Sequence, residues 1–565
     1  MVTRKTLKLG TRGSKLALWQ ANHVAGRVRA LGQEVELVIL KTKGDKDQSQ
    51  PVTQLGGVGV FVKELERALS AGEVDFAVHS LKDLPTDLPE GLAVAAYPGR
   101  VETHELLILN PKVHDPSPPS GPDWLPLSEG ARIGTASLRR RAQLLELRPD
   151  LEVRGIRGNV PRRVDKARTG EVDAVILAAA GVDRLELALE GLIRVDLPLD
   201  RFLPAPGQGA LAIEVRADDT ELLELFAKLD LAEARESTGA ERGLLNGLGR
   251  GCSVPLGTRA WRDERGICLE AILQANPPGH EPSDELVVMR RAFVRCAEAA
   301  RASSEALRIL GPQDLLPTTP EGLKGRRILI GREPNAASEL VSALQAAGAS
   351  SLCHAPTTFE VTGDNGAWSA ALSGLARSPL PWVLFSSARA VRAAGELSTG
   401  SLRETLANFA VGAVGPATAR ALACQRVPVD LLAPEDSATG VGLAAALLER
   451  LGAERPAILL PAARGGRPEL GEALSAAGCA VTRLELYASS PSTAPETLDA
   501  EAVLLASPAG ARVLLAGRAA GSTPPLVAIG PTTAAEVEAL GHAVAATAAT
   551  PTLAGQVEAL RAALG

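Results

Sequence analysis

Aromatic side chains are scarce in this chain of 565 residues, in which phenylalanine, tryptophan and tyrosine together make up 3%. Proteins that bind single-stranded nucleic acids stack the bases on such rings, so the composition argues against nucleic-acid binding. A large excess of one charge is lacking too, since the formal net charge is only −6. An anionic ligand would therefore need cations gathered at one place rather than a basic surface.

Cysteines are few and scattered, with six in the chain, no CxxC motif and no paired histidine spacing. This pattern indicates neither a disulfide framework nor a zinc site, and no other metal site is predicted. No apolar run approaches the roughly 18 residues of a membrane span, and the first residues lack a secretory apolar core. The sequence predicts a cytoplasmic protein without a membrane segment.

Strand-like and helical patterns alternate from about residue 6 to 215, and this rhythm predicts open parallel sheets covered by helices. Short strands with turns over 254–275 and a helical pattern over 297–309 predict a small α+β domain. The expected strands of the first part are 7–10, 34–40, 74–80 and 172–177, and the expected helices are 14–31, 61–70, 137–147 and 161–168.

An internal repeat marks the second half, which follows a Pro-, Gly- and Thr-rich linker at 311–322. Residues 382–391 are echoed by 502–511, and residues 411–419 by 526–534. Such self-similarity predicts two similar lobes. In each copy a strand is followed by small hydroxyl residues or proline that open a helix, so free N–H groups would face an anionic ligand between the lobes.

Two polar turns of the first half follow strand-like runs. GTRGSK (10–15) offers Arg12 and Ser14, and VHSLKDLP (78–85) ends in Lys82 and Asp83. In α/β sheets the carboxyl ends of the strands form the ligand crevice. An ordinary capped turn and an exposed turn remain the alternatives on these residues alone.

Arginines gather in three runs, at 139–141, 154–157 and 162–163, each following a strand. They suit a ligand with many carboxylates, and phosphate or RNA remain alternatives. The loop GLGRGCSVPLG (247–257) holds Cys252 among glycines. A nucleophilic thiolate and an inert loop cysteine are both compatible with that loop.

Taken together and in order, these segments resemble porphobilinogen deaminase (hydroxymethylbilane synthase) over about residues 6–310. The segments that carry the resemblance are TRGSKLALWQ (11–20), FVKELE (61–66), HSLKDLP (79–85), SLRR (137–140), RGNV (157–160), LPAPGQGA (203–210) and GCSVPLG (251–257).

The resemblance implies three domains, of which the first two are like a periplasmic binding protein. The expected limits are 1–103 plus 204–222 for the first domain, 104–203 for the second and 223–310 for the third. The implied reaction joins four porphobilinogen molecules head to tail, with loss of ammonia, into hydroxymethylbilane. The implied cofactor is a dipyrromethane held by a thioether to Cys252.

The resemblance also assigns roles to residues. Asp83 matches the catalytic aspartate. The expected cofactor-binding residues are Cys252, Lys82, Asp83, Ser14, Thr135, Ser137, Arg139 and Arg140, and the expected substrate-binding residues are Arg12, Arg157, Arg163 and Arg184. Gln54 and Val58 stand in the lid where the family commonly has lysines, and Arg250 stands where it often has glycine.

The second half, 324–565 after a linker at 311–323, resembles uroporphyrinogen-III synthase. The resemblance rests on FSSARAV (385–391), VGPATA (414–419), ATG (438–440), LP (460–461), LY (486–487) and IGPTT (529–533). It implies closure of hydroxymethylbilane with loss of water and no cofactor. Tyr487 is the candidate that assists departure of the hydroxyl, although packing is its alternative role. The expected carboxylate-binding residues are Ser386, Ser387, Thr418, Ser507, Thr532 and Thr533.

The sequence therefore predicts a monomeric α/β enzyme of tetrapyrrole biosynthesis with two activities. Its substrate would be porphobilinogen and its intermediate hydroxymethylbilane. Two alternatives stay open at this point: a deaminase with an inactive C-terminal part, and a binding protein of the same fold without catalysis.

Overall fold

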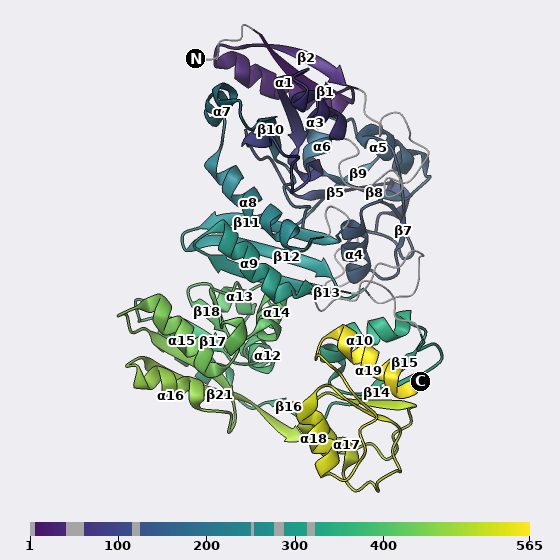
Figure 1. Cartoon of the computed structure of the whole chain (residues 1–565), viewed down its shortest axis with the longest axis vertical. Helices are drawn as coiled ribbons and strands as arrows, with labels where there is room; N and C mark the ends of the chain where they lie inside the picture. The colour runs from purple at the N-terminus through teal and green to yellow at the C-terminus, as the bar shows by residue number, and fades with distance from the viewer. Residues whose placement is uncertain (1–5, 41–61, 116–124, 250–253, 276–286, 313–321) are drawn as a thin grey trace. The chain divides into compact units, whose positions relative to one another are not determined.

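The computed structural model describes residues 6–40, 62–115, 125–249, 254–275, 287–312 and 322–565. The chain forms two compact units, Met1–Leu273 with Arg295–Leu307 and Gln274–Val294 with Arg308–Gly565. Helices and strands alternate through five sheets (Figure 1). The α/β fold class is confirmed. The domain limits given above stay predictions.

The first sheet has the strand order β2-β1-β3-β10-β4. Its elements are β1 (Thr6–Arg12), α1 (Lys15–Ala30), β2 (Glu34–Leu40), α3 (Lys63–Ser70), β3 (Phe76–Ser80), β4 (Leu92–Ala96), β10 (Leu211–Arg216) and α7 (Thr220–Ala227). Apolar residues of α1 and α7 pack on one face of the sheet, and those of α3 pack on the other. Helices on both faces explain why nearly all residues of the inner strands β3 and β10 are buried.

The second sheet has the order β7-β6-β8-β5-β9, with α4 in a core on one face and α5 in a core on the other. Its elements are β5 (Glu105–Leu109), β6 (Arg132–Gly134), α4 (Leu138–Leu147), β7 (Glu152–Arg154), α5 (Val160–Thr169), β8 (Ala174–Ala178), α6 (Ala179–Asp183) and β9 (Ile193–Leu197). Both sheets are mixed, because β5 and β10 run antiparallel to their neighbours. These are the strands with which the chain enters each sheet after leaving the other.

A three-stranded sheet of β11, β12 and β13 follows, flanked in sequence by two helices. Its elements are α8 (Ala232–Gly247), β11 (Leu256–Asp263), β12 (Gly266–Gln274), β13 (Met289–Cys296) and α9 (Ala299–Leu310). The short strands and the helix expected after residue 254 are therefore present.

The second unit contains two lobes with one sheet each. Lobe A has the order β15-β14-β22-β23-β24, and lobe B has the order β16-β21-β20-β17-β18-β19. Lobe A consists of β14 (Arg327–Gly331), α10 (Pro334–Ala346), β15 (Ser350–Cys353), β22 (Ala502–Leu505), α17 (Pro508–Leu515), β23 (Leu526–Ala528), α18 (Pro531–Ala539), β24 (Ala546–Thr547) and α19 (Leu553–Leu564).

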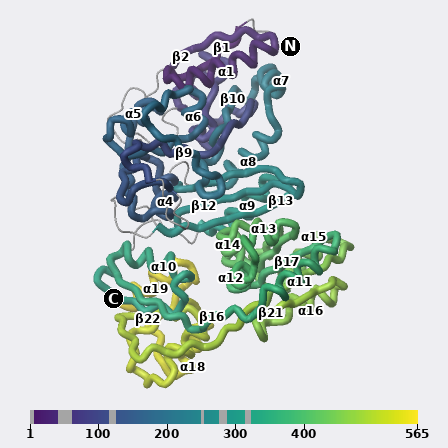
Figure 2. The backbone as a smooth tube through the Cα atoms, turned by 180° about the vertical axis from the view of Figure 1, so that it is seen from behind, coloured from purple at the N-terminus to yellow at the C-terminus, as the bar shows by residue number. Residues whose placement is uncertain are grey.

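Lobe B lies between these segments in the sequence. Its main elements are β16 (Thr357–Val361), α11 (Asn365–Leu375), β17 (Trp382–Phe385), α12 (Ala388–Leu397), β18 (Ala410–Ala413), α14 (Pro416–Cys424), β19 (Leu431–Leu432), α15 (Gly440–Leu451), β20 (Ala457–Ala463), α16 (Glu469–Ala476) and β21 (Ala480–Pro491). The paired strands β16 and β21 carry the chain from one lobe to the other (Figures 1 and 2).

The internal repeat corresponds to matching strand–helix pairs in the two lobes. The β17–α12 pair has Ser387 as its N-cap, and the β22–α17 pair has Ser507. In both helices the serine hydroxyl accepts a hydrogen bond from the backbone N–H three residues later. The second repeat gives β18–α14 and β23–α18, each opened by a Gly-Pro step. Among the helices described, none has the length and apolar character needed to cross a bilayer.

Candidate active site

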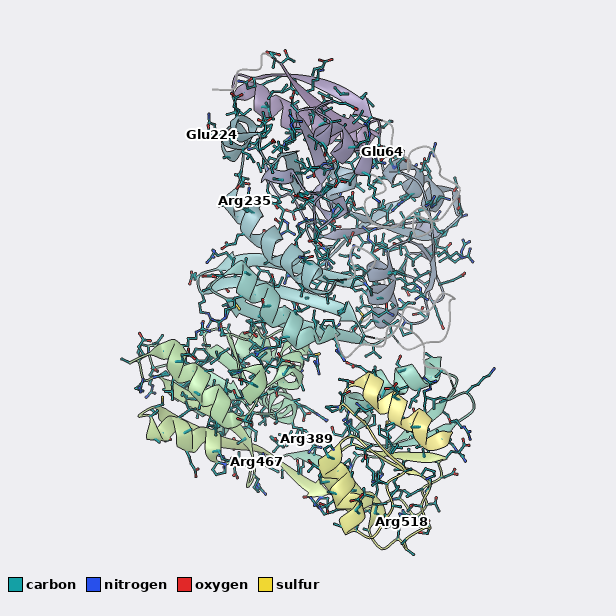
Figure 3. The ribbon with its side chains drawn as sticks, viewed as in Figure 1. Glu64, Glu224, Arg235, Arg389, Arg467 and Arg518 are labelled. Atoms are coloured by element: carbon teal, nitrogen blue, oxygen red, sulfur yellow. The ribbon has the colours of Figure 1, made fainter. Side chains whose placement is uncertain are left out.

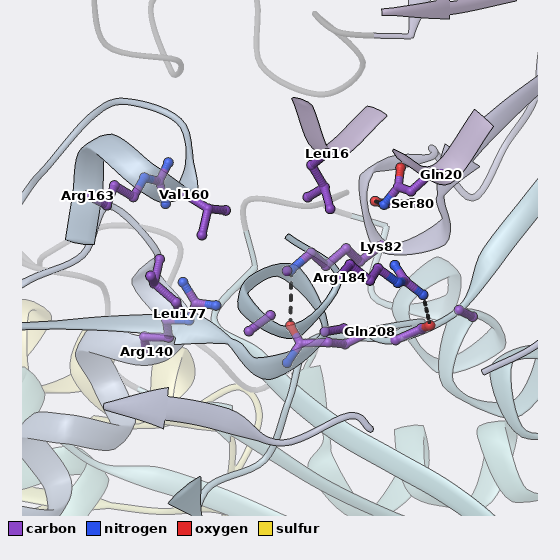
Figure 4. A pocket seen from close by; sticks show the side chains of 15 residues that line it. Leu16, Gln20, Ser80, Lys82, Arg140, Val160, Arg163, Leu177, Arg184 and Gln208 are labelled. Atoms are coloured by element: carbon purple, nitrogen blue, oxygen red, sulfur yellow. Dashed lines mark hydrogen bonds between the residues drawn. The ribbon is translucent and has the colours of Figure 1, made fainter. Parts of the chain in front are cut away.

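A cavity of about 100 Å³ opens where strands of the first two sheets end (Figure 4). β3 delivers Ser80 and the short helix η1 (Leu81–Asp83), while β8 leads into α6 and Arg184. The lining residues are Leu16, Gln20, Ser80, Lys82, Arg140, Val160, Arg163, Leu177, Ala178, Ala180, Gly181, Arg184, Gln208, Gly209 and Ala210. Four of these are cations and none is a carboxylate, so the cavity is suited to an anion.

Lys82 is half-buried, and its Nζ donates a hydrogen bond of 3.2 Å to Gln208 Oε1. Burial, helped by the guanidinium of Arg140, lowers the pKa of Lys82 to about 8, although the carboxylate of Asp83 opposes the shift. Burial disfavours the charged ammonium because it removes water. An anion bound beside Lys82 would restore the ammonium's ordinary preference for its proton.

Arg139 and Arg140 share one buried carboxylate, that of Glu105. Arg139 Nη2 lies 2.6 Å from Glu105 Oε1, and Arg140 Nη2 lies 2.8 Å from Oε2. Burial alone would raise the pKa of Glu105, but the two guanidinium groups outweigh burial and hold it well below its usual range. Two cations facing one anion leave a net positive charge beside the cavity.

The two arginines differ in what else they touch. Arg140 also donates to Ile176 O at 3.0 Å and lines the cavity. Arg139 donates to Leu203 O at 2.8 Å and lies outside the cavity lining. Arg139 therefore orients Glu105 and balances its charge.

Two further arginines line the cavity, and each donates to a backbone carbonyl oxygen, which does not neutralise its charge. Arg163 Nε donates to Gly158 O at 2.7 Å, and Arg184 Nη2 donates to Gly209 O at 2.8 Å. The guanidinium of Arg184 also stacks over the Trp19 ring at 5.4 Å. Burial lowers the pKa of Arg184 to about 10 and also lowers that of Arg163, on which Arg140 acts in the same direction.

Arg184, which lines the cavity, has a buried guanidinium nitrogen, Nε, without a hydrogen-bond partner within the described part of the chain, and so does Arg157 at Nη2, although Arg157 lies outside the cavity lining. A buried donor left unpaired costs free energy, and more so when it is charged. These donors therefore fit a ligand with several carboxylates.

Ser14, Thr135 and Ser137 form the starts of the helices that were expected behind them. Ser14 Oγ accepts from Ala17 N at 3.3 Å, and Ser137 Oγ accepts from Arg140 N at 3.4 Å. Thr135 Oγ1 accepts from Ser137 N at 3.2 Å. None of the three lines the cavity, and neither does Arg12, the last residue of β1. They lie at the same strand ends as the lining residues.

Asp83 is exposed and lies outside the cavity lining. Its carboxylate nevertheless acts electrostatically on both Lys82 and Arg163. Asp83 and the buried Glu105 are therefore two carboxylates that act on cations of the cavity. Cys252, Arg250, Gln54 and Val58 lie outside the described residues, so no geometry is assigned to them.

Sequence reasoning missed Gln208, Gln20 and Ser80 as members of the site. Gln208 is fully buried, and its Nε2 donates to Thr103 O at 2.8 Å while its Oε1 accepts from Lys82. Gln20 Nε2 donates to Ser80 Oγ at 2.7 Å. The Gly-Gln-Gly motif at 207–209 could have indicated that Gln208 lies at a closely packed site. A Cβ on Gly209 (φ +85°) would lie 2.5 Å from Val101 O, so the chain around Gln208 is closely packed.

In the second unit, Tyr487 and Ser387 meet. Their hydroxyl oxygens are 2.9 Å apart, although the residues come from β21 and from the end of β17. β20 lies between these two strands, with Ala463 paired to Tyr487, so the phenol passes over small residues. Tyr487 is buried and packs against Phe359. It therefore combines packing with a polar contact.

The other expected hydroxyl groups of the second unit differ in exposure. Ser386 and Thr532 are exposed, Ser507 is half-buried, and Thr418 and Thr533 are buried. A missed residue is Arg389 in the first turn of α12 (Figure 3). It donates to Ser489 Oγ at 2.9 Å and to Thr357 Oγ1 at 2.8 Å, and it pairs with Glu333 of lobe A.

The first part of the chain combines mixed α/β sheets with a cation-rich cavity, and this arrangement is typical of proteins that bind an anionic small molecule. Residues 7–224 match the family model "Porphobilinogen deaminase, dipyromethane cofactor binding domain". The porphobilinogen deaminase of Syntrophotalea carbinolica is 41% identical over 323 residues, which cover 56% of this chain and 99% of that protein. That of Rubrobacter xylanophilus is 46% identical over 273 residues, covering 48% and 85%. The chain belongs to the porphobilinogen deaminase family.

The second part is covered by another family model, "Uroporphyrinogen-III synthase HemD", over residues 323–558. A uroporphyrinogen III synthase structure from Thermus thermophilus is 20% identical with a TM-score of 0.29, covering 42% of this chain and 99% of that one. The chain is a bifunctional enzyme of haem biosynthesis, with hydroxymethylbilane synthase and uroporphyrinogen-III synthase activities and a dipyrromethane cofactor. The comparisons favour neither of the two alternatives left open by the sequence.

Proposed function

We propose that the cation-lined cavity binds the carboxylates of the pyrrole chain during condensation of porphobilinogen. The observation that carries this proposal is Arg184 Nε, a buried guanidinium nitrogen of the cavity lining without a hydrogen-bond partner among the described residues. Each porphobilinogen brings an acetate and a propionate, so the negative charge grows with the chain. Lys82, Arg140 and Arg163 supply further positive charge, with Arg12, Ser14, Thr135 and Ser137 at neighbouring strand and helix ends.

Asp83 is proposed as the catalytic carboxylate. Loss of ammonia leaves an electron-poor methylene-pyrrole cation on the incoming substrate. Its carboxylate, which acts electrostatically on Lys82 and Arg163, would accept pyrrole N–H hydrogen bonds and stabilise that cation. It also receives the proton released when the rings join.

Cys252 is proposed as the attachment point of the dipyrromethane. When bound, that group supplies the pyrrole carbon from which the chain grows. The residues around the cavity fit it, because their unpaired donors need acidic partners. The glycines on either side of Cys252 leave room for a bulky substituent.

In the second unit, Tyr487 is proposed to assist departure of the hydroxyl from hydroxymethylbilane. Its contact with Ser387 Oγ at 2.9 Å supports an oriented phenol. Helix N-termini with Ser386, Ser387, Thr418, Ser507, Thr532 and Thr533 are proposed to bind substrate carboxylates.

Two further proposals concern the whole chain. The deaminase domains are proposed to end near residues 103, 203, 222 and 310. The protein is proposed to act as a monomer in the cytoplasm, where thiols stay reduced.

Incubation of the purified protein with porphobilinogen tests these assignments. We expect ammonia release and uroporphyrinogen III in the wild type, and almost no turnover in Asp83→Ala despite retained substrate binding. Asp87→Ala is the matched control, since Asp87 is an exposed carboxylate in the same segment. Ordinary turnover in Asp83→Ala contradicts the proposed role, and a type I product alone contradicts the second activity.

Intact mass tests Cys252 independently. The denatured wild type is expected to carry an adduct of two pyrrole units that Cys252→Ala lacks, whereas Cys268→Ala retains it. An adduct that persists in Cys252→Ala would place the attachment elsewhere.

A further inference from the structure

Arg332 stands at the carboxyl end of β14, the strand that lies between β15 and β22 in lobe A. Its side chain is half-buried, and no hydrogen bond or ion pair engages its guanidinium among the residues described. Burial lowers the pKa of Arg332, while Glu339 opposes this shift through space. A cation removed from water without a bound anion is costly, so this position is suited to an anionic ligand.

A second arginine of this unit, Arg389, differs from Arg332 because a carboxylate neutralises it. Glu333 follows Arg332 directly and pairs with Arg389 of lobe B, which also donates to Thr357 and Ser489. Arg389 is thus neutralised and fixed. Arg332 keeps its full charge at the same end of the strand.

Other anion-binding groups share this edge of the sheet. β14, β22 and β23 are parallel, with Gly331 paired to Leu505 and Leu505 paired to Ala528. The segments after these strands therefore emerge side by side, and two of them lead into the N-termini of α17 and α18. The first turn of α17 lies close, since a Cβ on Gly510 would be 3.5 Å from Gly331 O. Helix N-termini attract anions through their free N–H groups.

We propose that Arg332 binds a carboxylate of the linear tetrapyrrole in the synthase half, together with the N-terminal turn of α17. This inference rests on the proposed function of that half. It adds a charged, specificity-determining residue to a site for which the sequence indicated only hydroxyl groups. Hydroxymethylbilane carries an acetate and a propionate on every ring, so each ring can offer a carboxylate to Arg332.

The test uses the full-length enzyme, Arg332→Gln and hydroxymethylbilane as the substrate of the synthase reaction. Loss of one charged hydrogen bond is expected to lower kcat/KM about tenfold, mainly through a higher KM. The share of type I product should rise, because unbound hydroxymethylbilane closes without the enzyme. Ammonia release from porphobilinogen should stay at the wild-type rate, which shows that the deaminase half is intact.

Arg327→Gln is the matched control. Arg327 is at the opposite end of the same strand and is paired with Asp499 at 2.8 Å on the surface. This variant is expected to keep the wild-type KM and isomer ratio. Arg332→Lys retains the charge without the two-pronged geometry, so its KM should lie between those of the wild type and Arg332→Gln.

An unchanged KM and isomer ratio in Arg332→Gln overturns the inference. A wild type that makes only type I product instead overturns the proposed function of the second half. Should Arg332→Gln fold poorly by its melting temperature, Arg332→Lys decides. A KM raised about threefold at an unchanged melting temperature supports the inference, and a wild-type KM contradicts it.

Discussion

At the scale of single residues, the site is an arrangement of cations whose charges are only partly balanced. Glu105 is the buried carboxylate that Arg139 and Arg140 share, and Gln208 positions Lys82 without neutralising it. The protein thus gathers positive charge in a place where water does not fully solvate it. A ligand with several carboxylates supplies the missing partners.

The first prediction concerns the pH dependence of substrate binding. Lys82 has a pKa lowered to about 8 in the free enzyme, mainly by burial. A bound carboxylate favours the ammonium form of Lys82, so tight substrate binding requires this side chain to be protonated. The affinity for the substrate should therefore fall as the pH rises above about 8, by at most about tenfold per pH unit. The kcat/KM for ammonia release should decline on this alkaline limb.

Lys82→Gln serves as its control. This variant is expected to have about tenfold lower kcat/KM near pH 7 and no limb near pH 8. The same limb in Lys82→Gln would assign the titration to another group or to the substrate's own amine.

The second prediction concerns Glu105. Glu105→Gln leaves two buried guanidinium groups without their anion, and we expect it to lower the free energy of unfolding by about 3–5 kcal/mol. Because the folded-state pKa of Glu105 is lowered, its contribution is complete above the unfolded value near 4.3 and is lost only as the pH falls towards the folded value. Urea unfolding at pH 7 measures the change.

A matched variant is Glu152→Gln, which removes a largely exposed carboxylate paired with Arg154; both residues lie on β7, the edge strand of the same sheet. Its stability should stay close to that of the wild type, because surface ion pairs contribute little. Equal stability of Glu105→Gln and the wild type would show that the buried charges are compensated in another way.

At the scale of elements, periodicity and capping residues predicted most helices closely. α1 begins after Ser14, α4 after Ser137, and α5 ends at Gly170 in a left-handed conformation. Local sequence carries this information, since a hydroxyl cap or a glycine acts on its own helix end. The antiparallel direction of β5 and β10 was missed, because strand direction depends on where the chain crosses between sheets.

The sequence alone could not show which residues, distant along the chain, pair with the arginines of the candidate sites. Arginine runs after strands indicated Arg140 and Arg163, and the family resemblance indicated Arg184; all three line one cavity. The partner of Arg139 and Arg140 comes from β5, more than thirty residues earlier, and nothing local in Glu105 indicates it. The same holds for Arg389, whose contacts are made by three separate segments of the second unit.

At the scale of the whole molecule, each unit has two large sheets and cores of its own, while the three-stranded sheet takes β11 and nearly all of β12 from the first unit and most of β13 from the second. Clusters in the first unit join α1, α4 and α5 to its two large sheets, and clusters in the second join α10, α15 and α17 to the sheets of its lobes. The cavity with Lys82 lies within the first unit, and Tyr487, Ser387 and Arg332 lie within the second. The residues proposed for each activity therefore belong to one unit.

The last prediction follows from this separation. A mixture of Asp83→Ala, which lacks the first activity, with Tyr487→Phe, which lacks the proposed phenol of the second, should again form uroporphyrinogen III from porphobilinogen. Hydroxymethylbilane released by one molecule reaches another by diffusion, while part of it closes spontaneously to the type I isomer. The type III share should therefore rise with total protein concentration. Chromatographic separation of the two isomers measures it, with each variant alone as control. A mixture that yields only the type I isomer at every concentration would mean that the second activity needs both functional halves in one chain.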